Sequence, residues 1–311
     1  MMTRATTQLR ELIGRGPTLY VPGCYNALSA RVLENAGFGA IYMTGYGTSL
    51  ALTGLPDVGL TTMSEMVANA RYIASAVRVP LIADADTGFG NAINVIRTVC
   101  EYIGAGVAGM HLEDQVSPKR CGHVAGRLVI PLEEAVGKIR AAADARDGLD
   151  PDFVLIARTD ARGASGGSLD DAIRRVNAYL AAGADLGFVE GPTSIEEVQR
   201  ICREVQGPVF YNMTGVSPRM TIEEMRALGI AVCISPNAML RSALAAMHDL
   251  AAQMHAEGPA AETWFMEGFR QHPLGDLHTF AGFDQIRAWE REYLGEEAMQ
   301  KYADSVGHVP R

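Results

Sequence analysis

Eight short apolar runs recur along this chain, and an amphipathic segment follows each of them. Such alternation is typical of β/α units that supply strands to a parallel sheet. Eight is the number of units that closes a (β/α)8 barrel, so we predict an α/β protein with the TIM-barrel fold. The predicted strands are Thr18–Pro22, Ala40–Thr44, Leu81–Ala85, Gly109–Glu113, Phe153–Arg158, Leu186–Glu190, Val209–Asn212 and Ala231–Ser235.

Capping residues between these runs mark where helices begin. Ser64 and Glu65 indicate the start of one helix, and Ser168 followed by Leu-Asp-Asp indicates another. The segment Thr221–Glu224 has the Thr-x-x-Glu spacing of a capping box, in which each side chain satisfies a backbone amide of the other residue. Helices are therefore expected in the segments that separate the strands.

The chain has 311 residues, of which 48% are hydrophobic, so it is able to bury one large core. We assign residues 1–258 to a single barrel domain. Aromatic and charged residues dominate after that point, among them Trp264, Phe269 and Trp289. Because aromatic-rich terminal segments bury much area at low entropic cost, we expect residues 259–311 to form helices that dock on a neighbouring subunit.

Charge and cysteine content exclude several classes of protein. The net charge is -9 and the 27 basic residues are scattered, which disfavours binding to nucleic acid or anionic membranes. No window approaches the roughly 18 apolar residues of a membrane span, and the N-terminus has no signal-peptide core. The five cysteines form no CxxC pair, which argues against a disulfide framework and a structural zinc site. We therefore expect a cytoplasmic protein.

Carboxylates end two neighbouring predicted strands. Asp84 and Asp86 follow the third apolar run at a spacing that places both side chains on one face, and Glu113 ends the fourth. Adjacent strands lie roughly 4.8 Å apart, so the three carboxylates are able to surround one ion. Oxygen-only ligands favour Mg²⁺, with Mn²⁺ as a substitute, and Mg²⁺ in turn favours a keto or hydroxy acid. The alternative is a pair of solvated turn aspartates.

A cysteine lies in a basic loop between the fourth and fifth strands. Cys121 is flanked by Lys119, Arg120 and His123, a setting that lowers the pKa of a thiol. Such a thiol suits proton transfer, and the surrounding loop suits a lid that excludes water. The alternative is a basic loop with an incidental cysteine.

An arginine ends the fifth predicted strand. The fork of Arg158 is suited to binding a carboxylate, and Asp160 is close enough in sequence to hold it in place. A structural Arg–Asp pair at the barrel rim is the alternative.

Taken together, these segments resemble the isocitrate lyase/phosphoenolpyruvate mutase superfamily. They are most similar to its methylisocitrate lyase, 2-alkylmalate lyase and carboxyphosphonoenolpyruvate phosphonomutase branch, over about residues 10 to 295. The segment Lys119–His123, joined to His111–Gln115, is the most specific part of the resemblance. The other matching segments are Tyr42–Gly45, Gly54–Asp57, Asp84–Gly90, Ala157–Asp160 and Glu190.

The resemblance implies a role for each matching position. Asp86 would bind Mg²⁺ directly, while Asp84 and Glu113 would hold it through water. Gly122 and His123 would lie on the mobile lid, and Cys121 would be the acid. The remaining residues would bind the keto acid and complete the pocket: Thr44, Gly45, Tyr46, Asp57, Arg158, Glu190 and Asn212. We add Tyr42 as a candidate base near the substrate hydroxyl.

The implied reaction is cleavage of a 2-hydroxy di- or tricarboxylate to an α-keto acid and a second carboxylate. The resemblance also implies a helix-swapped barrel assembled as a homotetramer, a dimer of dimers. A phosphonomutase, an oxaloacetate hydrolase or decarboxylase, and an inactive barrel scaffold remain alternatives. A class-II aldolase-like metal enzyme is disfavoured because the chain lacks multiple histidines at these positions.

One segment departs from the family pattern. After Asn212 the chain reads Met-Thr-Gly-Val-Ser-Pro-Arg219, which is shorter than usual and has no glutamate. Tyr46, Phe210 and Tyr211 are also bulkier than the residues common in the family. We therefore expect a narrow pocket that favours compact diacids over tricarboxylates, with Arg219 as a possible partner of a distal carboxylate.

Overall fold

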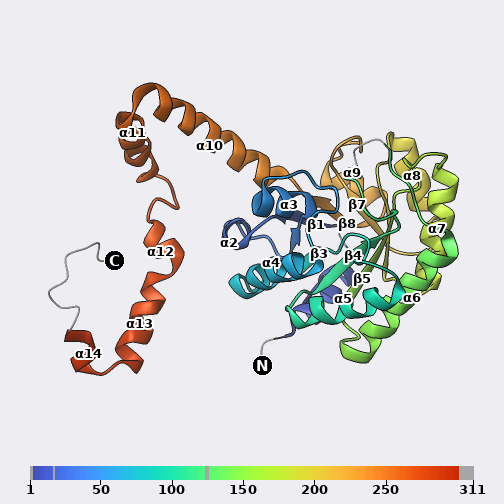
Figure 1. Ribbon diagram of the computed structural model, residues 1–311, viewed down its shortest axis with the longest axis horizontal. Helices are drawn as coiled ribbons and strands as arrows, with labels where there is room; N and C mark the ends of the chain where they lie inside the picture. The colour runs from blue at the N-terminus through green and yellow to red at the C-terminus, as the bar shows by residue number, and fades with distance from the viewer. Residues whose placement is uncertain (1–2, 17, 123–125, 301–311) are drawn as a thin grey trace. The chain divides into compact units, whose positions relative to one another are not determined.

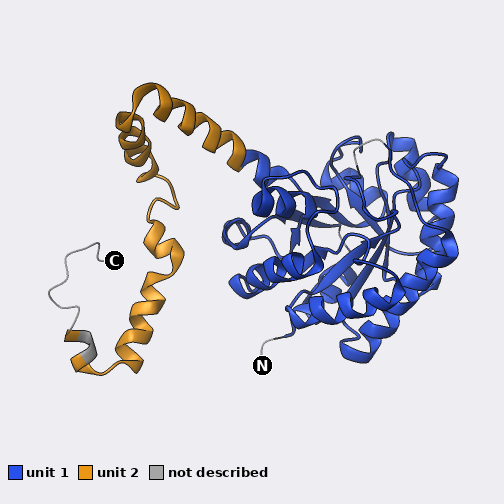
Figure 2. Ribbon diagram, in the orientation of Figure 1, with its two compact units in different colours: residues 1–242 blue, residues 243–311 orange. Residues whose placement is uncertain are grey.

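The computed structural model describes residues 3–16, 18–122 and 126–300. It divides the chain into two compact units, Met1–Ser242 and Ala243–Arg311 (Figure 2). Within the described ranges, no helix is both long enough and apolar enough to cross a membrane. The first unit carries all the strands and the site discussed below.

Eight parallel strands close into a barrel in their sequence order, β1 to β8 (Figure 1). The predicted TIM-barrel fold is therefore confirmed, and every predicted strand is present. Their bounds are β1 Leu19–Cys24, β2 Ile41–Met43, β3 Leu81–Asp84, β4 Gly109–Glu113, β5 Val154–Thr159, β6 Leu186–Val189, β7 Val209–Asn212 and β8 Ile230–Ser235.

Helices follow the strands and cover the outside of the barrel (Figure 1). The helices of the first unit, with α1 preceding the first strand, are α1 Ala5–Gly14, α2 Ala27–Asn35, α3 Gly45–Thr53, α4 Met63–Ala76, α5 Ala92–Gly104, α6 Leu132–Leu149, α7 Leu169–Ala181, α8 Ile195–Glu204 and α9 Ile222–Ala227. Helix α10, Ala238–Glu257, begins in the first unit and continues into the second.

The capping residues act largely as predicted. Ser168 accepts a hydrogen bond from the amide of Asp171 at the start of α7, and Thr221 forms a capping box with Glu224 at the start of α9. The prediction that Ser64 opens α4 was wrong. Thr62 is the capping residue, because Glu65 accepts its amide at 2.7 Å and its own hydroxyl accepts the amide of Glu65.

The barrel interior is packed with apolar side chains from alternate positions of the strands, including Ile82, Val154 and Phe188. Leu9 of α1 is fully buried in the same cluster, so this helix packs against the interior. Gly109 makes room for it, because a Cβ at that position would lie 3.1 Å from a methyl group of Leu9. The filled interior leaves the strand ends as the place for a site.

The strand register sets the catalytic edge. Asp84 of β3 is paired with His111 of β4, and Glu113 of β4 is paired with Arg158 of β5. All four residues lie at or near the carboxyl ends of their strands, so the closed sheet gathers them at one rim of the barrel.

The second unit contains α11 Pro259–Phe269, α12 Leu277–Ala281, α13 Phe283–Tyr293 and α14 Glu296–Gln300. Large apolar side chains are exposed on these helices, among them Trp264, Phe265, Phe283 and Trp289. The helical segment predicted for 259–311 falls within this unit.

Candidate active site

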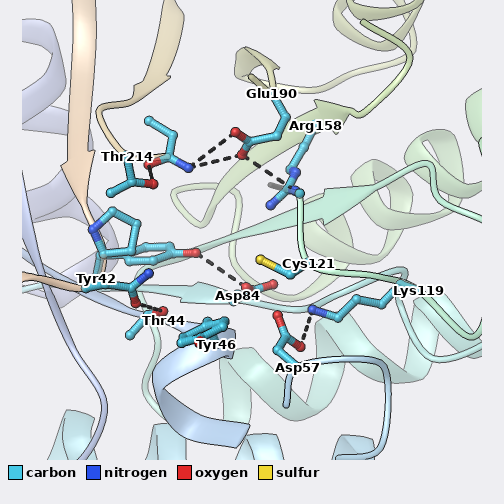
Figure 3. A pocket seen from close by; sticks show the side chains of 14 residues that line it. Tyr42, Thr44, Tyr46, Asp57, Asp84, Lys119, Cys121, Arg158, Glu190 and Thr214 are labelled. Atoms are coloured by element: carbon cyan, nitrogen blue, oxygen red, sulfur yellow. Dashed lines mark hydrogen bonds and ion pairs between the residues drawn. The ribbon is translucent and has the colours of Figure 1, made fainter. Parts of the chain in front are cut away.

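A cavity lies at the carboxyl ends of the strands (Figure 3). Ten of the residues predicted from the sequence line it: Tyr42, Thr44, Tyr46, Asp57, Asp84, Cys121, Gly122, Arg158, Glu190 and Asn212. Lys119, Thr214, Pro236 and Asn237 complete the lining. The predicted residue His123 lies outside the described residues.

Asp84 ends β3, and Asp86 lies in the tight turn that follows. The carboxylate of Asp84 accepts the backbone amides of Gly45 at 3.2 Å and of Asp86 at 3.0 Å. Asp86 has a φ of 47°, a left-handed conformation that non-glycine residues rarely adopt. These two amides and the unusual turn fix both carboxylates beneath the cavity floor.

Lys119 connects the loop after β4 to this acidic turn. Its ammonium lies 2.5 Å from Oδ1 of Asp57 and 2.8 Å from Oδ1 of Asp86. All three side chains are buried. The sequence around Lys119 marks it only as a neighbour of the cysteine, because nothing local shows that its ammonium reaches two aspartates from other loops.

The acidic cluster has too little positive charge around it to favour full ionisation, and it has acceptor atoms without hydrogen bonds. Burial raises the pKa of Asp86 to about 6 despite Lys119, and burial raises the pKa of Glu113 well above its usual value. Burial also opposes ionisation of Asp84, but His111, Lys119 and Arg158 outweigh it and lower its pKa to about 2. Oδ1 of Asp86, although close to Lys119, and Oε1 of Glu113 are buried without a hydrogen bond.

These oxygens fit a magnesium ion. Among the described residues, no three His, Cys, Asp or Glu side chains converge as direct ligands of one metal. Mg²⁺ does not require such a cluster, because it keeps several waters and often uses one or two carboxylates. Asp86 as the direct ligand, with Asp84 and Glu113 behind water molecules, therefore fits the arrangement.

Tyr42 and His111 form a buried polar pair next to Asp84. The Tyr42 hydroxyl lies 2.7 Å from Nε2 of His111 and 3.4 Å from Oδ2 of Asp84. Burial raises the pKa of Tyr42 well above 10 and lowers the pKa of His111 to about 4, so both side chains are neutral at pH 7. This setting disfavours the base role predicted for Tyr42, because a phenol with a raised pKa holds its proton and acts as a donor.

Arg158 is a buried guanidinium surrounded by carboxylates. Its Nε and Nη2 donate to Asp160 at 2.9 and 3.1 Å, while Glu113 lies 3.3 Å and Glu190 3.5 Å away. Burial lowers its pKa, but the carboxylates outweigh that effect and keep the pKa well above its usual value. Arg158 is therefore a permanent positive charge on the cavity wall, held by Asp160 as predicted.

The thiol of Cys121 points into the cavity (Figure 3). The loop that carries it is fixed by Gln115, whose side-chain amide donates to the carbonyl of Arg120 at 2.8 Å and accepts its N–H at 2.9 Å. Gly122 lies against Arg158 and Glu190, and a side chain at that position would overlap the guanidinium. The structure therefore brings the thiol and the arginine to one cavity.

The predicted keto-acid residues Thr44, Gly45 and Tyr46 lie where α3 begins. The Thr44 hydroxyl caps the helix by accepting the amide of Gly47 at 3.2 Å. The amide of Gly45 is used by Asp84, so Gly45 supports the acidic turn and does not line the cavity. Tyr46 lines the cavity and is 38% exposed, which places its ring at the mouth.

The opposite polar wall is a chain of hydrogen bonds. Asn212 donates to Glu190 at 3.1 Å, and the Thr214 hydroxyl donates to Asn212 at 2.8 Å. The bulky residues beside Asn212 do not narrow the cavity, contrary to expectation. Phe210 packs against Phe188 inside the barrel, and Tyr211 turns outward to donate to the carbonyl of Pro218. Arg219 is not among the lining residues.

Comparison with known proteins places this site in a family. The family model described as phosphoenolpyruvate phosphomutase matches residues 9–255. The chain therefore belongs to the phosphoenolpyruvate mutase/isocitrate lyase superfamily. The predicted superfamily is confirmed, as is the prediction of a lyase-type enzyme at that level.

Two curated relatives cover most of the chain. It is 50% identical to 2,3-dimethylmalate lyase of Eubacterium barkeri over 288 residues, which is 92% of this chain and 97% of that protein. It is 45% identical to the chloroplastic carboxyvinyl-carboxyphosphonate phosphorylmutase of Arabidopsis thaliana, over 91% of this chain and 81% of the relative.

Solved structures agree with this placement. A crystal structure of 2,3-dimethylmalate lyase has a TM-score of 0.88 at 36% identity and covers 99% of this chain and 100% of its own. Phosphonopyruvate hydrolase in complex with oxalate and Mg²⁺ has a TM-score of 0.81 at 32% identity, over 94% of this chain and 100% of its own.

Proposed function

We propose that this protein is a Mg²⁺-dependent carbon–carbon lyase that cleaves a 2-hydroxy diacid of the 2-alkylmalate type. The products are an α-keto acid and a second carboxylic acid. The observation that carries the proposal is that the Cys121 thiol and the Arg158 guanidinium line one cavity with the carboxylate of Asp84, which accepts the backbone amide of Asp86.

The charge of the cavity supports a diacid. Among the described lining residues, Lys119 and Arg158 carry the positive charges. Arg158 suits the keto-acid end of the substrate because its fork is fixed by Asp160. The rest of the wall includes the uncharged side chains of Tyr46, Thr214 and Asn237, none of which offers a positive charge to a third carboxylate.

In this reaction the bond between C2 and C3 breaks, and the C2 hydroxyl gives its proton to a carboxylate of the cavity wall, Asp84 or Glu190, and becomes the keto oxygen. The electron pair of the broken bond moves to C3, where the Cys121 thiol delivers a proton. Arg158 stabilises the negative charge on the keto-acid side. Bound Mg²⁺ would polarise the same oxygens, held directly by Asp86 and through water by Asp84 and Glu113. The neutral Tyr42 hydroxyl orients polar groups as a donor.

The similarity to 2,3-dimethylmalate lyase supports this substrate class over a tricarboxylate. The 45% identity to a phosphorylmutase makes the mutase the main alternative. An inactive scaffold is disfavoured because Asp86, Cys121 and Arg158 are all present in the site.

The second unit supports a further part of the proposal, namely a homotetramer built as a dimer of dimers with exchanged C-terminal helices. Its exposed Trp264, Phe265 and Trp289 need an apolar partner, which a second copy of the chain would provide. Light scattering gives the mass that tests it. The absence of a CxxC pair among the five cysteines fits a reducing cytoplasm.

The deciding experiment is a substrate panel with Mg²⁺. It compares 2,3-dimethylmalate, 2-methylisocitrate, oxaloacetate and phosphonopyruvate, with coupled detection of pyruvate and direct detection of oxalate. We expect the highest kcat/KM with the alkylmalate, and we expect a Cys121→Ser control to lower that activity by at least about 100-fold. A preference for phosphonopyruvate, or oxalate release from oxaloacetate as the main reaction, would replace the lyase proposal with the mutase or hydrolase alternative.

A further inference from the structure

Asp160, the residue that holds Arg158, is shared with a second arginine. Its Oδ1 accepts Nη1 of Arg127 at 2.9 Å as well as Nη2 of Arg158 at 3.1 Å, and its Oδ2 accepts Nε of Arg158 at 2.9 Å. The Asp160 side chain is completely buried. Only one of the two arginines, Arg158, lines the cavity.

The backbone segment of Arg127 is fixed by two hydrogen bonds, and its guanidinium is confined by a close neighbour. Its carbonyl accepts the amide of Ser165 at 3.0 Å, and the next residue, Leu128, accepts the amide of Val116 at 2.9 Å. Its guanidinium lies against Gly163, where any side chain would overlap Nη2. Arg127 is buried despite its charge. A buried guanidinium with so little freedom fixes the plane of the carboxylate that it contacts.

The charges around Arg158 explain why a second cation matters. Arg158 faces three carboxylates: Asp160, Glu113 and Glu190. Without Arg127, one cation would face three carboxylates, and little positive potential would remain for an incoming ligand. Arg127 takes part of the charge of Asp160, so more of the Arg158 charge is available to the cavity.

We propose that Arg127 is a positioning residue that acts through Asp160 to set the orientation and the available charge of Arg158 for the carboxylate of the keto acid. This inference rests on the proposed function. It assigns to Arg127, which does not line the cavity, a specific effect on ligand affinity.

The test measures binding of oxalate, a planar dicarboxylate, by calorimetry in the presence of Mg²⁺. We expect Arg127→Met to weaken oxalate binding by about 10- to 100-fold, the range typical of lost outer-shell partners. Arg127→Lys restores part of the affinity because it keeps the charge. Gly163→Ala has the same direction of effect as Arg127→Met, because its methyl group displaces the guanidinium without removing it.

Two matched controls separate this effect from general damage at the rim. Arg162→Met removes a partly exposed arginine that pairs with Glu197, and Gly137→Ala adds a methyl group where nothing lies within 4 Å. Both controls are expected to bind oxalate within about twofold of the unmodified protein. Circular dichroism of every variant confirms the fold.

An Asp160→Asn background shows whether Arg127 acts through Asp160. In that background, Arg127→Met should change oxalate affinity by less than about twofold. The two substitutions disrupt the same interaction, so their effects on affinity do not add. The inference is overturned if Arg127→Met weakens oxalate binding by the same factor in both backgrounds. It is also overturned if the single substitution Arg127→Met leaves oxalate affinity unchanged. If the unmodified protein binds no oxalate, the proposed function fails. A crystal structure of Arg127→Met then decides the inference separately, since an unmoved Arg158 overturns it.

Discussion

The ammonium of Lys119 lies 2.8 Å from Oδ1 of Asp86, the carboxylate proposed to bind the metal ion directly. The two residues come from different loops, one after β4 and the other after β3. A metal ion and the ammonium would therefore share the same carboxylate, and each would lower the affinity of the carboxylate for the other. Asp57, 2.5 Å from the ammonium, gives Lys119 a second partner to retain when a metal ion is bound.

Replacing Lys119 with methionine should therefore tighten Mg²⁺ binding, by about tenfold, because a competing positive charge is removed at similar side-chain volume. Calorimetric titration of the metal-free protein gives the dissociation constant. Lys119→Arg keeps the charge and serves as the control. Unchanged or weaker Mg²⁺ binding in Lys119→Met would show that the ammonium does not compete for Asp86.

Metal removal should abolish turnover. We expect no activity in EDTA, with recovery on addition of Mg²⁺ or Mn²⁺, since the cluster offers only oxygen ligands. Asp86→Asn should raise the Mg²⁺ concentration needed for half-maximal activity by at least about tenfold, because the direct ligand loses its charge. Full turnover by the chelator-treated protein would rule out the metal proposal.

Substitution of Cys121 by serine should separate binding from chemistry. We expect kcat to fall by about 10²- to 10⁴-fold, the contribution of a positioned acid, because a hydroxyl is a far weaker acid than a thiol. Oxalate affinity in the presence of Mg²⁺ should stay within about threefold. Cys100→Ser, at an exposed cysteine of α5, is the control and should retain full activity. Near-normal turnover in Cys121→Ser would return this cysteine to an incidental role.

The enzyme should strongly prefer substrates with two carboxylates over substrates with three. The kcat/KM for a 2-alkylmalate is expected to exceed that for 2-methylisocitrate by about 100-fold, because a carboxylate without a cationic partner in a desolvated cavity is costly. Steady-state kinetics on the two substrates provides the ratio. Thr214→Lys, which adds a cation to the cavity wall, should narrow that ratio. A preference for 2-methylisocitrate in the unmodified protein would contradict the pocket argument and leave the metal and thiol proposals standing.

Beneath the site, Asp114 should contribute strongly to stability. Its buried carboxylate accepts the hydroxyls of Thr159 at 2.6 Å and Tyr179 at 2.7 Å and the amide of Asp160 at 2.9 Å. Asp114→Asn replaces one acceptor oxygen with a donor, which should lower the free energy of unfolding by about 2–4 kcal/mol.

Urea denaturation measures that loss. Asp147→Asn is the matched control: its side chain is 60% exposed and pairs with Arg146, so the expected change is under about 1 kcal/mol. Equal effects of the two substitutions would mean that the buried network contributes no special stability.

The sequence predicts the barrel well because alternating apolar and amphipathic segments specify which residues form strands. It also places Asp84, Glu113 and Arg158 at the rim, since each ends an apolar run. It does not predict which way Phe210 and Tyr211 point. Strands of a parallel barrel are buried on both faces, so their sequence has no polar alternation to separate inward from outward positions.

Contacts between distant loops are a second limit of the sequence. Pro236 and Asn237 follow the last strand and line the cavity, but neither is a titratable residue that attracts attention. Lys119 and Arg127 lie in a basic stretch whose local pattern is that of a solvated loop. Only the fold shows that both are buried and bound to aspartates of other loops.

The left-handed backbone of Asp86 has a consequence for protein engineering. At φ 47° a residue with a side chain is less stable than glycine by on the order of 1 kcal/mol of conformational free energy. The burial of Asp86 beside two other aspartates adds repulsion that a neutral residue would relieve, and Asp57 would keep Lys119 paired once the Asp86 charge is gone. A laboratory selection for heat resistance alone would therefore tend to enrich glycine or asparagine at this position. The selected variants would be more stable barrels without catalytic activity.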